Sequence, residues 1–442
     1  MKSFIFAVMF VAAARVAIAQ TPPLRLTVAD AIAAGFDHSH RLAEARAREE
    51  AARAAAKTAG LARMPAVGAT AGYMRTNHVE EFFVPQPNGT RLVVYPDIPD
   101  NFTSRLSLQW PIYTAGRIDA LERAAAAEVD AAAADIETAR ADLRLEIVRV
   151  YWAAVTSREA VRVLEESLTR ANAQVTDAKR RFEVGLIPPN EVLSLEAQLS
   201  RERAHLIEAS NIREAALIDL RRLIGAPPDA VVELADSLED AGAGRSMPAE
   251  SDVRGLVADV LKARPERKAL SFRLAAAEAR EKAARTTTKP TIAVAGGVDY
   301  ANPNPRIFPR QGKWQESWDV GVFLHWNFLD FGRARSQAAE AAAIANGTRA
   351  RIAEVEAMVS ADLRQRLLDV ESTQAAVTAA ADAVRSAAEA RRVVADRFAA
   401  GVATSTDVLV AQVALLETQL ARTRALANVR LAEARLERAM GR

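Results

Sequence analysis

The sequence predicts a mainly α-helical fold with a small membrane β-barrel component, built from two tandem copies of one unit. Three observations support this. A glycine turn at 181–193 recurs at 397–409, which is 216 residues later. Each turn follows a long helical run, 117–182 or 333–398, that contains no proline. Short segments of alternating polarity precede each run. Each unit is therefore predicted to comprise helix, strand, strand, long helix, turn and helix.

The duplication extends beyond the turns. The same offset aligns Trp110 with Trp326 and Gly116 with Gly332. An internal repeat of this length indicates two equivalent halves rather than unrelated domains. The predicted division is a signal peptide at 1–19, a first repeat at 20–225, a linker at 226–251 and a second repeat at 252–442.

The helical segments have a coiled-coil-like period. Apolar residues in the run 117–182 recur every 3.5 to 3.6 residues, which predicts one continuous apolar seam. At about 1.5 Å per residue, such a run extends about 100 Å. Helical hairpins are expected at 117–224 and 333–440, with shorter helices at 28–63 and 253–288.

The two turns have residues that suit the end of one helix and the start of another. Gly185 and Gly401 can adopt positive φ at a helix C-terminus without a Cβ clash. Asn190 and Thr406 stand where the return helices are expected to begin. Both segments are therefore predicted to be tight turns at the ends of hairpins.

Four segments alternate with the period of β-strands, whereas 84–100 is expected to be a loop. In one of them apolar residues at 106, 108, 110 and 112 share a face, and polar residues at 105, 107 and 109 share the other. The predicted strands are at about 66–74, 102–112, 291–300 and 317–328.

Strands of about ten residues have the length that crosses a bilayer. Four strands cannot close a barrel, and open edges in lipid leave backbone groups unsatisfied, so several chains must share strands. Three chains would supply twelve. The alternative is an antiparallel sheet covered by helices in a soluble protein, but no amphipathic helix remains to cover it. The aromatic residues expected at the membrane interfaces are Tyr73, Trp110, Tyr113, Tyr300, Trp314 and Phe328.

The N-terminus has the features of an export signal. Lys2 precedes an apolar run at 4–14, and small residues at 17 and 19 predict cleavage before Gln20. An uncleaved membrane anchor is the alternative, but the run is short for a bilayer.

Composition and motifs argue against a catalytic or metal site and against nucleic-acid binding. The formal net charge is +2 and cysteine is absent, so there is no large basic field, disulfide or thiolate metal site. His38 and His40 diverge on a helix, and Glu80 with Glu81 suits a solvated loop. No catalytic residue, metal site or cofactor is predicted, and the chain is not expected to be an enzyme.

The order of these motifs resembles the TolC-like outer-membrane efflux protein family. The resemblance rests on the segments 108–117 and 324–333, each with Leu-x-Trp near its start and Gly-Arg at its end, and on Arg-Phe-x-x-Gly in both turns. It implies a homotrimer with a twelve-stranded barrel among outer-membrane lipids and an α-helical tunnel in the periplasm. It also implies a passive exit duct that receives substrates from an inner-membrane transporter and a periplasmic adaptor protein.

The resemblance further implies roles for the two turns. Gly185, Leu186, Gly401 and Val402 would contact the adaptor at the hairpin tips, unless the glycines serve turn geometry alone.

The same resemblance implies a periplasmic gate. Asp407 would line the narrowest opening with Glu191 in the equivalent place, unless Asp407 only caps its helix. Phe398 would contribute packing to closure. Two other classes remain open: a periplasmic adaptor or scaffold coiled coil, and a general diffusion porin. A porin would not need the long helices.

Overall fold

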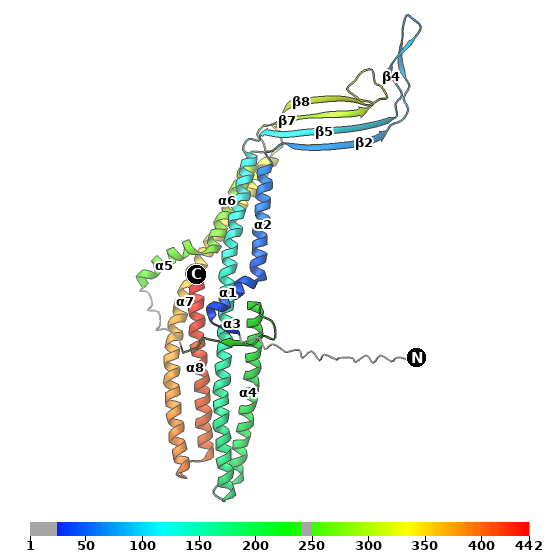
Figure 1. Cartoon of the computed structure of the whole chain (residues 1–442). Coiled ribbons are helices and arrows are strands. Elements are labelled where there is room, and N and C mark those ends of the chain that lie inside the picture. Colours follow the sequence, from blue (N-terminus) through cyan, green and yellow to red (C-terminus); the bar gives the residue numbers. More distant parts are fainter. Residues whose placement is uncertain (1–23, 240–249, 442) are drawn as a thin grey trace, which may run out of the picture. The chain divides into compact units, whose positions relative to one another are not determined.

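The computed structural model describes residues 24–239 and 250–441, so the predicted signal peptide at 1–19 lies outside the described residues (Figure 1). The chain forms two compact units, and each of its two long helices contributes to both of them. Of the described residues, the first unit contains 24–39, 142–239 and 365–438, and the second contains 40–141, 250–364 and 439–441.

The first unit is built mainly from two helical hairpins. Its described elements are β1 (Leu24–Leu26), α1 (Val28–His38), the later part of α3 (Arg117–Glu183), α4 (Pro189–Ile224), β6 (Val232–Leu234), the later part of α7 (Arg333–Ala399) and nearly all of α8 (Ser405–Ala439).

The second unit joins a β-sheet to the remaining helices. Its elements are α2 (His40–Leu61), β2 (Ala66–Arg75), β3 (Phe82–Pro85), β4 (Arg91–Tyr95), β5 (Asp100–Tyr113), α5 (Glu250–Ala263), α6 (Pro265–Arg285), β7 (Thr291–Asn302), β8 (Gln315–His325) and the earlier parts of α3 and α7.

The main sheet is antiparallel, with strand order β2-β5-β7-β8 (Figure 1). Leu106 lies opposite Val298, which lies opposite Trp318, so these three side chains share one face. That face is apolar and open, since Leu106 is 53% and Trp318 is 73% exposed. The other face carries Arg105, paired in register with Asp299. The sheet is thus apolar on one side and polar on the other.

Two details of the strands differ from the sequence predictions. The hairpin β3–β4 overlaps the expected loop at 84–100: Phe83 pairs with Val93, and Gly89 in the turn between the strands has a φ of 77°. The last strand ends at His325 rather than at 328. His325 pairs with Thr291, and Pro290 precedes that residue, so no ladder partner remains beyond it.

The two shorter helical segments are each broken once, which corrects the expected continuous helices at 28–63 and 253–288. Ser39 has extended ψ of 113° and separates α1 from α2. Arg264 separates α5 from α6 because the residue before Pro265 is disfavoured in the α-region. The first break has no proline or glycine to signal it.

The predicted linker at 226–251 contributes β6, which pairs in parallel with β1. The buried Tyr151 hydroxyl donates to the Leu26 carbonyl at 2.9 Å and accepts from the Asp236 N–H at 3.3 Å. Burial raises the pKa of Tyr151 above its usual value, so the hydroxyl stays neutral and can donate. These bonds fix the linker to α3 and β1 within the first unit.

The hairpin α3–α4 has its own apolar core near the tip. Ala171, Val175 and Ala178 of α3 pack against Val192 and Leu195 of α4. At about 25 cal/mol per Å² of apolar area removed from water, such a seam is what holds two long helices together. Across residues 24–239 and 250–441, none of the helices combines the length and the apolar character of a membrane span.

Candidate functional site

The first hairpin tip is a left-handed turn that presents an apolar side chain. Gly185 has a φ of 75°, and its N–H donates to the Phe182 carbonyl at 2.9 Å. The Leu186 N–H donates to the Arg181 carbonyl at 2.8 Å, which closes the helix end in a Schellman arrangement. Leu186 is 73% exposed. The turn therefore projects a leucine into solvent.

The second tip repeats this geometry. Gly401 has a φ of 76°, and its N–H donates to the Phe398 carbonyl at 3.0 Å. The Val402 N–H donates to the Arg397 carbonyl at 2.9 Å, and Val402 is 66% exposed. No atom lies within 4 Å of a Cβ placed on either Gly185 or Gly401, so their requirement for glycine comes from φ alone.

Asp407 completes a capping box at the start of α8. Its Oδ2 accepts from the Thr404 N–H at 2.9 Å and from Thr404 Oγ1 at 2.8 Å, while its own N–H donates to Thr404 Oγ1 at 3.2 Å. The cap is thus Thr404 rather than the expected Thr406. These bonds, with Arg397 nearby, lower the pKa of Asp407 below its ordinary value.

The start of α4 differs. Pro188 and not Asn190 precedes the first helical residue, and it offers no side-chain cap. The Glu191 N–H donates to the Pro188 carbonyl at 3.2 Å. Glu191 and Asp407 therefore occupy similar sequence positions but have different local bonding.

Phe398 has a cationic partner that the sequence did not indicate. The Arg181 guanidinium lies 4.7 Å from the centroid of the Phe398 ring. This contact joins the end of α3 to the end of α7 within the first unit. A cation–π contact at a partly exposed site contributes about 0.5–1 kcal/mol. Phe398 thus packs beneath an arginine of the other hairpin, Arg181.

The aromatic residues of the sheet form two clusters. At one end Tyr73 lies 5.0 Å from Phe102, and Trp314 stacks on Tyr300 at 5.0 Å between centroids. Phe102 also lies 5.9 Å from Trp314, which joins the two pairs. Phe102 is a further aromatic residue beyond the predicted interface set, and it occupies an alternate position in the same strand as Trp110.

The second cluster lies where the strands meet the helices. The indole N–H of Trp110 donates to the Arg63 carbonyl at 3.1 Å, and that of Trp326 donates to the Thr288 carbonyl at 3.0 Å. Trp326 lies 6.0 Å from Phe328, and Tyr113 is half exposed. Trp326 is a further aromatic residue beyond the predicted set. It lies one residue after β8 and makes a bond to a backbone carbonyl like the one that Trp110 makes from β5.

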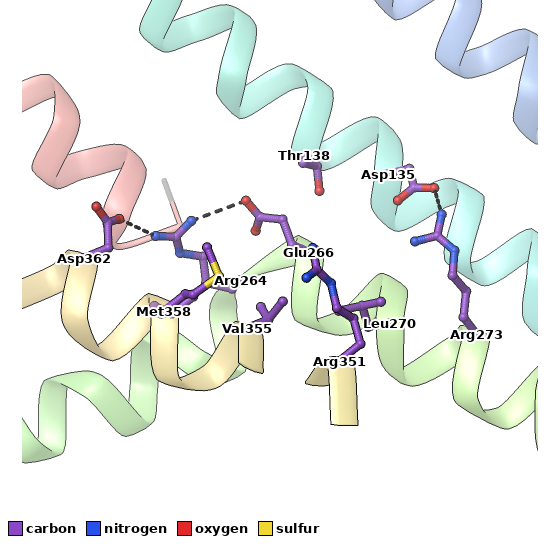
Figure 2. A pocket seen from close by; sticks show the side chains of 11 residues that line it. Asp135, Thr138, Arg264, Glu266, Leu270, Arg273, Arg351, Val355, Met358 and Asp362 are labelled. Carbon is purple, nitrogen blue, oxygen red and sulfur yellow. Dashed lines mark hydrogen bonds and ion pairs between the residues drawn. The ribbon is translucent and has the colours of Figure 1, made fainter. Parts of the chain in front are cut away.

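A cavity of about 500 Å³ lies between α3, α6 and α7 in the second unit. Figure 2 shows Arg264 between Asp362 and Glu266, with Arg273 directed at Asp135. The Arg264 side chain is 8% exposed, and it lies 3.2 Å from Asp362 and 3.3 Å from Glu266. Its Nε donates to the Ala439 carbonyl at 2.9 Å. The cluster therefore fastens the end of α8 to α6 and α7.

Among the charged side chains that line this cavity, Arg264 pairs with Asp362 and Glu266, and Arg273 pairs with Asp135. Within the described parts of the chain, no three His, Asp or Glu side chains are grouped to hold a metal ion.

Comparison with known proteins assigns the family. The outer membrane efflux protein family matches residues 36–226 and 256–442, and the chain belongs to this family. Protein CyaE of Bordetella pertussis is 28% identical over 210 residues, which are 47% of this chain and 43% of CyaE. The alkaline protease secretion protein AprF of Pseudomonas aeruginosa is 26% identical over 137 residues, 31% of this chain and 27% of AprF. The matched stretches thus span less than half of either relative.

The fold is shared with solved outer-membrane channels. The outer membrane protein VceC of Vibrio cholerae superposes with a TM-score of 0.76 at 22% identity, over 94% of this chain and 96% of VceC. The family match confirms the resemblance to outer-membrane efflux proteins and the outer-membrane location expected from it. The superposition shows that the chain has the fold of solved outer-membrane channels.

Proposed function

We propose that this protein is the trimeric exit duct of a tripartite export system in the outer membrane. The observation that supports it most is the four-stranded sheet with one exposed apolar face. Its edge strands β2 and β8 have no partner on their outer sides within the described residues. In lipid such edges must be paired, and three copies would join them into a closed barrel of twelve strands.

The aromatic clusters suit this placement. Phe102 and Trp110 lie eight residues apart on β5, about 26 Å along a strand and about 20 Å across a bilayer for a strand tilted by about 40°. Two aromatic girdles flanking an apolar band are typical of outer-membrane barrels. A periplasmic adaptor or scaffold would not need an uncovered apolar sheet.

The two halves, 20–225 and 252–442, would contribute equally to the assembly. In support, α3 and α7 each contain 67 residues, and the return helices α4 and α8 contain 36 and 35. The tips would meet a periplasmic adaptor protein, and an inner-membrane transporter would supply the substrate and the energy.

The assembly is tested on the purified full-length protein. We expect detergent extraction from outer membranes, an SDS-resistant trimer that dissociates on heating, and ion conductance in planar bilayers. A stable monomer that remains in solution without detergent would refute the trimeric barrel.

We also propose that Asp407 has two roles, as a helix cap and as one of three carboxylates around the periplasmic opening. The cap contribution has a defined pH dependence. Because the pKa is lower in the folded protein, the contribution is complete above the ordinary Asp pKa of about 3.9 and is lost as the pH falls through the lower folded value.

Asp407→Asn is expected to reduce cation selectivity, because three like charges around one axis attract cations. Reversal potentials in a salt gradient, and block by multivalent cations added from the periplasmic side, measure the effect. Asp382→Asn is the control, since Asp382 is an exposed acid on α7 paired with Arg385. If Asp407→Asn left the cation selectivity unchanged and caused only a small loss of thermal stability, Asp407 would act only as a helix cap.

A further inference from the structure

In the connection between β7 and β8, residues 303–314, the stretch 304–310 folds over the polar face of the sheet, whereas Trp314 at its end stacks on Tyr300 on the apolar face. Asn304 is 1% exposed, and its Nδ2 donates to the Gln315 carbonyl and to Ser317 Oγ, each at 3.0 Å. Its Oδ1 accepts from the Arg306 N–H at 2.9 Å. Ser317 lies opposite Asp299, on the polar side. The connection therefore begins by turning inward over this face rather than away from the sheet.

An ion cluster holds the connection there. Arg306 Nη2 lies 2.6 Å from Asp319, and its Nη1 donates to the Trp318 carbonyl at 3.1 Å. Arg105 bridges the same Asp319 at 2.9 Å and Asp299 at 2.5 Å. Two arginines and two aspartates thus join β5, β7, β8 and the connection. Charge-assisted hydrogen bonds of this kind are about twice as strong as neutral ones.

Gly297 makes this arrangement possible. Gly297 lies between Arg105 and Asp319 in the sheet, opposite Ser107 on β5 and Asp319 on β8. A Cβ at Gly297 would lie 2.9 Å from Arg105 Nη2 and 2.7 Å from the Leu106 carbonyl oxygen. Because Gly297 has no side chain, the Arg105 side chain can cross β7 at this position and reach Asp319.

A second arginine fixes the far side of the connection. Arg310 Nη2 donates to Asn101 Oδ1 at 3.1 Å, and its Nη1 donates to the Tyr95 hydroxyl at 2.9 Å. Its partners are neutral, so its positive charge is not compensated by a carboxylate. Residues 303–314 contain Arg306, Arg310 and Lys313 and no acid. The connection thus carries a net positive charge even after Arg306 is paired.

We propose that residues 303–314 form a positively charged constriction at the outer exit of the pore. The ion pair between Arg306 and Asp319 holds this segment in place. The segment limits the size of departing cargo and favours anionic cargo. The inference rests on the proposed function, because the polar face lines the pore only if the apolar face meets lipid. Each of three chains would contribute one such segment. Arg306 and Arg310 would then determine which cargo passes the exit, by its size and its charge.

The absence of cysteine permits a direct test in the full-length protein. Gln109→Cys places a thiol on the polar face, beyond the connection, and Leu106→Cys places one on the apolar face. In intact outer membranes, a small methanethiosulfonate added from outside should label Gln109→Cys, whereas a bulky polyethylene-glycol maleimide should not. Adding Arg306→Gln or Asp319→Asn should accelerate the bulky labelling about tenfold, because a charge-assisted latch is lost.

Charge is tested with small reagents of opposite sign. An anionic methanethiosulfonate should label Gln109→Cys faster than a cationic one, and Arg310→Gln should reduce that preference. Arg91→Gln, which removes an arginine stacked 4.6 Å from Phe83 on the β3–β4 hairpin, should alter neither bulky labelling nor the preference.

The outcomes separate this inference from the proposed function. Free labelling of Leu106→Cys as well as Gln109→Cys would refute the membrane barrel itself. Protection of Leu106→Cys, together with rapid bulky labelling of Gln109→Cys while Arg306 is intact, would keep the barrel and overturn the constriction. Equal rates for the anionic and cationic reagents would overturn the proposed preference for anions.

Discussion

Arg264→Leu is expected to lower the free energy of unfolding by about 2–3 kcal/mol, since removing one partner of a buried ion cluster leaves the desolvation of the others uncompensated. Arg264 is 8% exposed, whereas Glu266 and Asp362 are 27% and 36% exposed, which places the effect at the lower end of the range for buried pairs. The bond to the Ala439 carbonyl is lost as well. Leucine fills part of the volume without replacing either interaction.

Thermal unfolding of the purified protein, followed by tryptophan fluorescence, measures this effect. A loss of this size corresponds to a fall of about 4–12 °C for units of about 200 residues. Lys262→Leu is the matched control, because Lys262 and its partner Asp259 are both 80% exposed and 3.9 Å apart. It should change the free energy by less than about 0.5 kcal/mol. A melting temperature for Arg264→Leu equal to that of Lys262→Leu would contradict a structural role for the cluster.

The features visible in the sequence are those that depend on local periodicity. Alternation placed Leu106 and Arg105 on opposite faces of a strand, and the structure has them so. Glycine with positive φ at Gly185 and Gly401 was predicted from the end of a helical run. These properties depend on a residue and its near neighbours, so a single sequence contains them.

The features that escaped prediction depend on which distant segments meet. Arg105 was placed on the polar face of its strand, but its contact with Asp319 requires the order of the strands and the gap at Gly297. Arg181 and Phe398 are joined only by the packing of two hairpins. The break at Ser39 has no proline or glycine to signal it. A single sequence has no signal for such pairs unless strand order and register are known first.

The hairpin tips combine two properties that are rarely found together at a turn. Leu186 and Val402 are apolar and largely exposed, and their backbones are fixed by hydrogen bonds to the preceding helices. Exposed apolar side chains on rigid backbone mark contact sites, because binding removes them from water at little cost in conformational entropy. Replacing them leaves the glycine geometry and the α3–α4 core unchanged. The tips can therefore be altered without unfolding the hairpins.

Leu186→Asp combined with Val402→Asp is expected to abolish export, because a carboxylate at each tip would have to be desolvated against the adaptor protein. Cargo release by cells lacking the native protein measures export, while SDS-resistant trimer and bilayer conductance report on assembly and should be retained. Lysine at both positions should have the same effect if the contact is apolar, and Leu186→Ile with Val402→Ile should preserve export. Wild-type export by the aspartate variant, with the trimer intact, would show that the adaptor binds elsewhere.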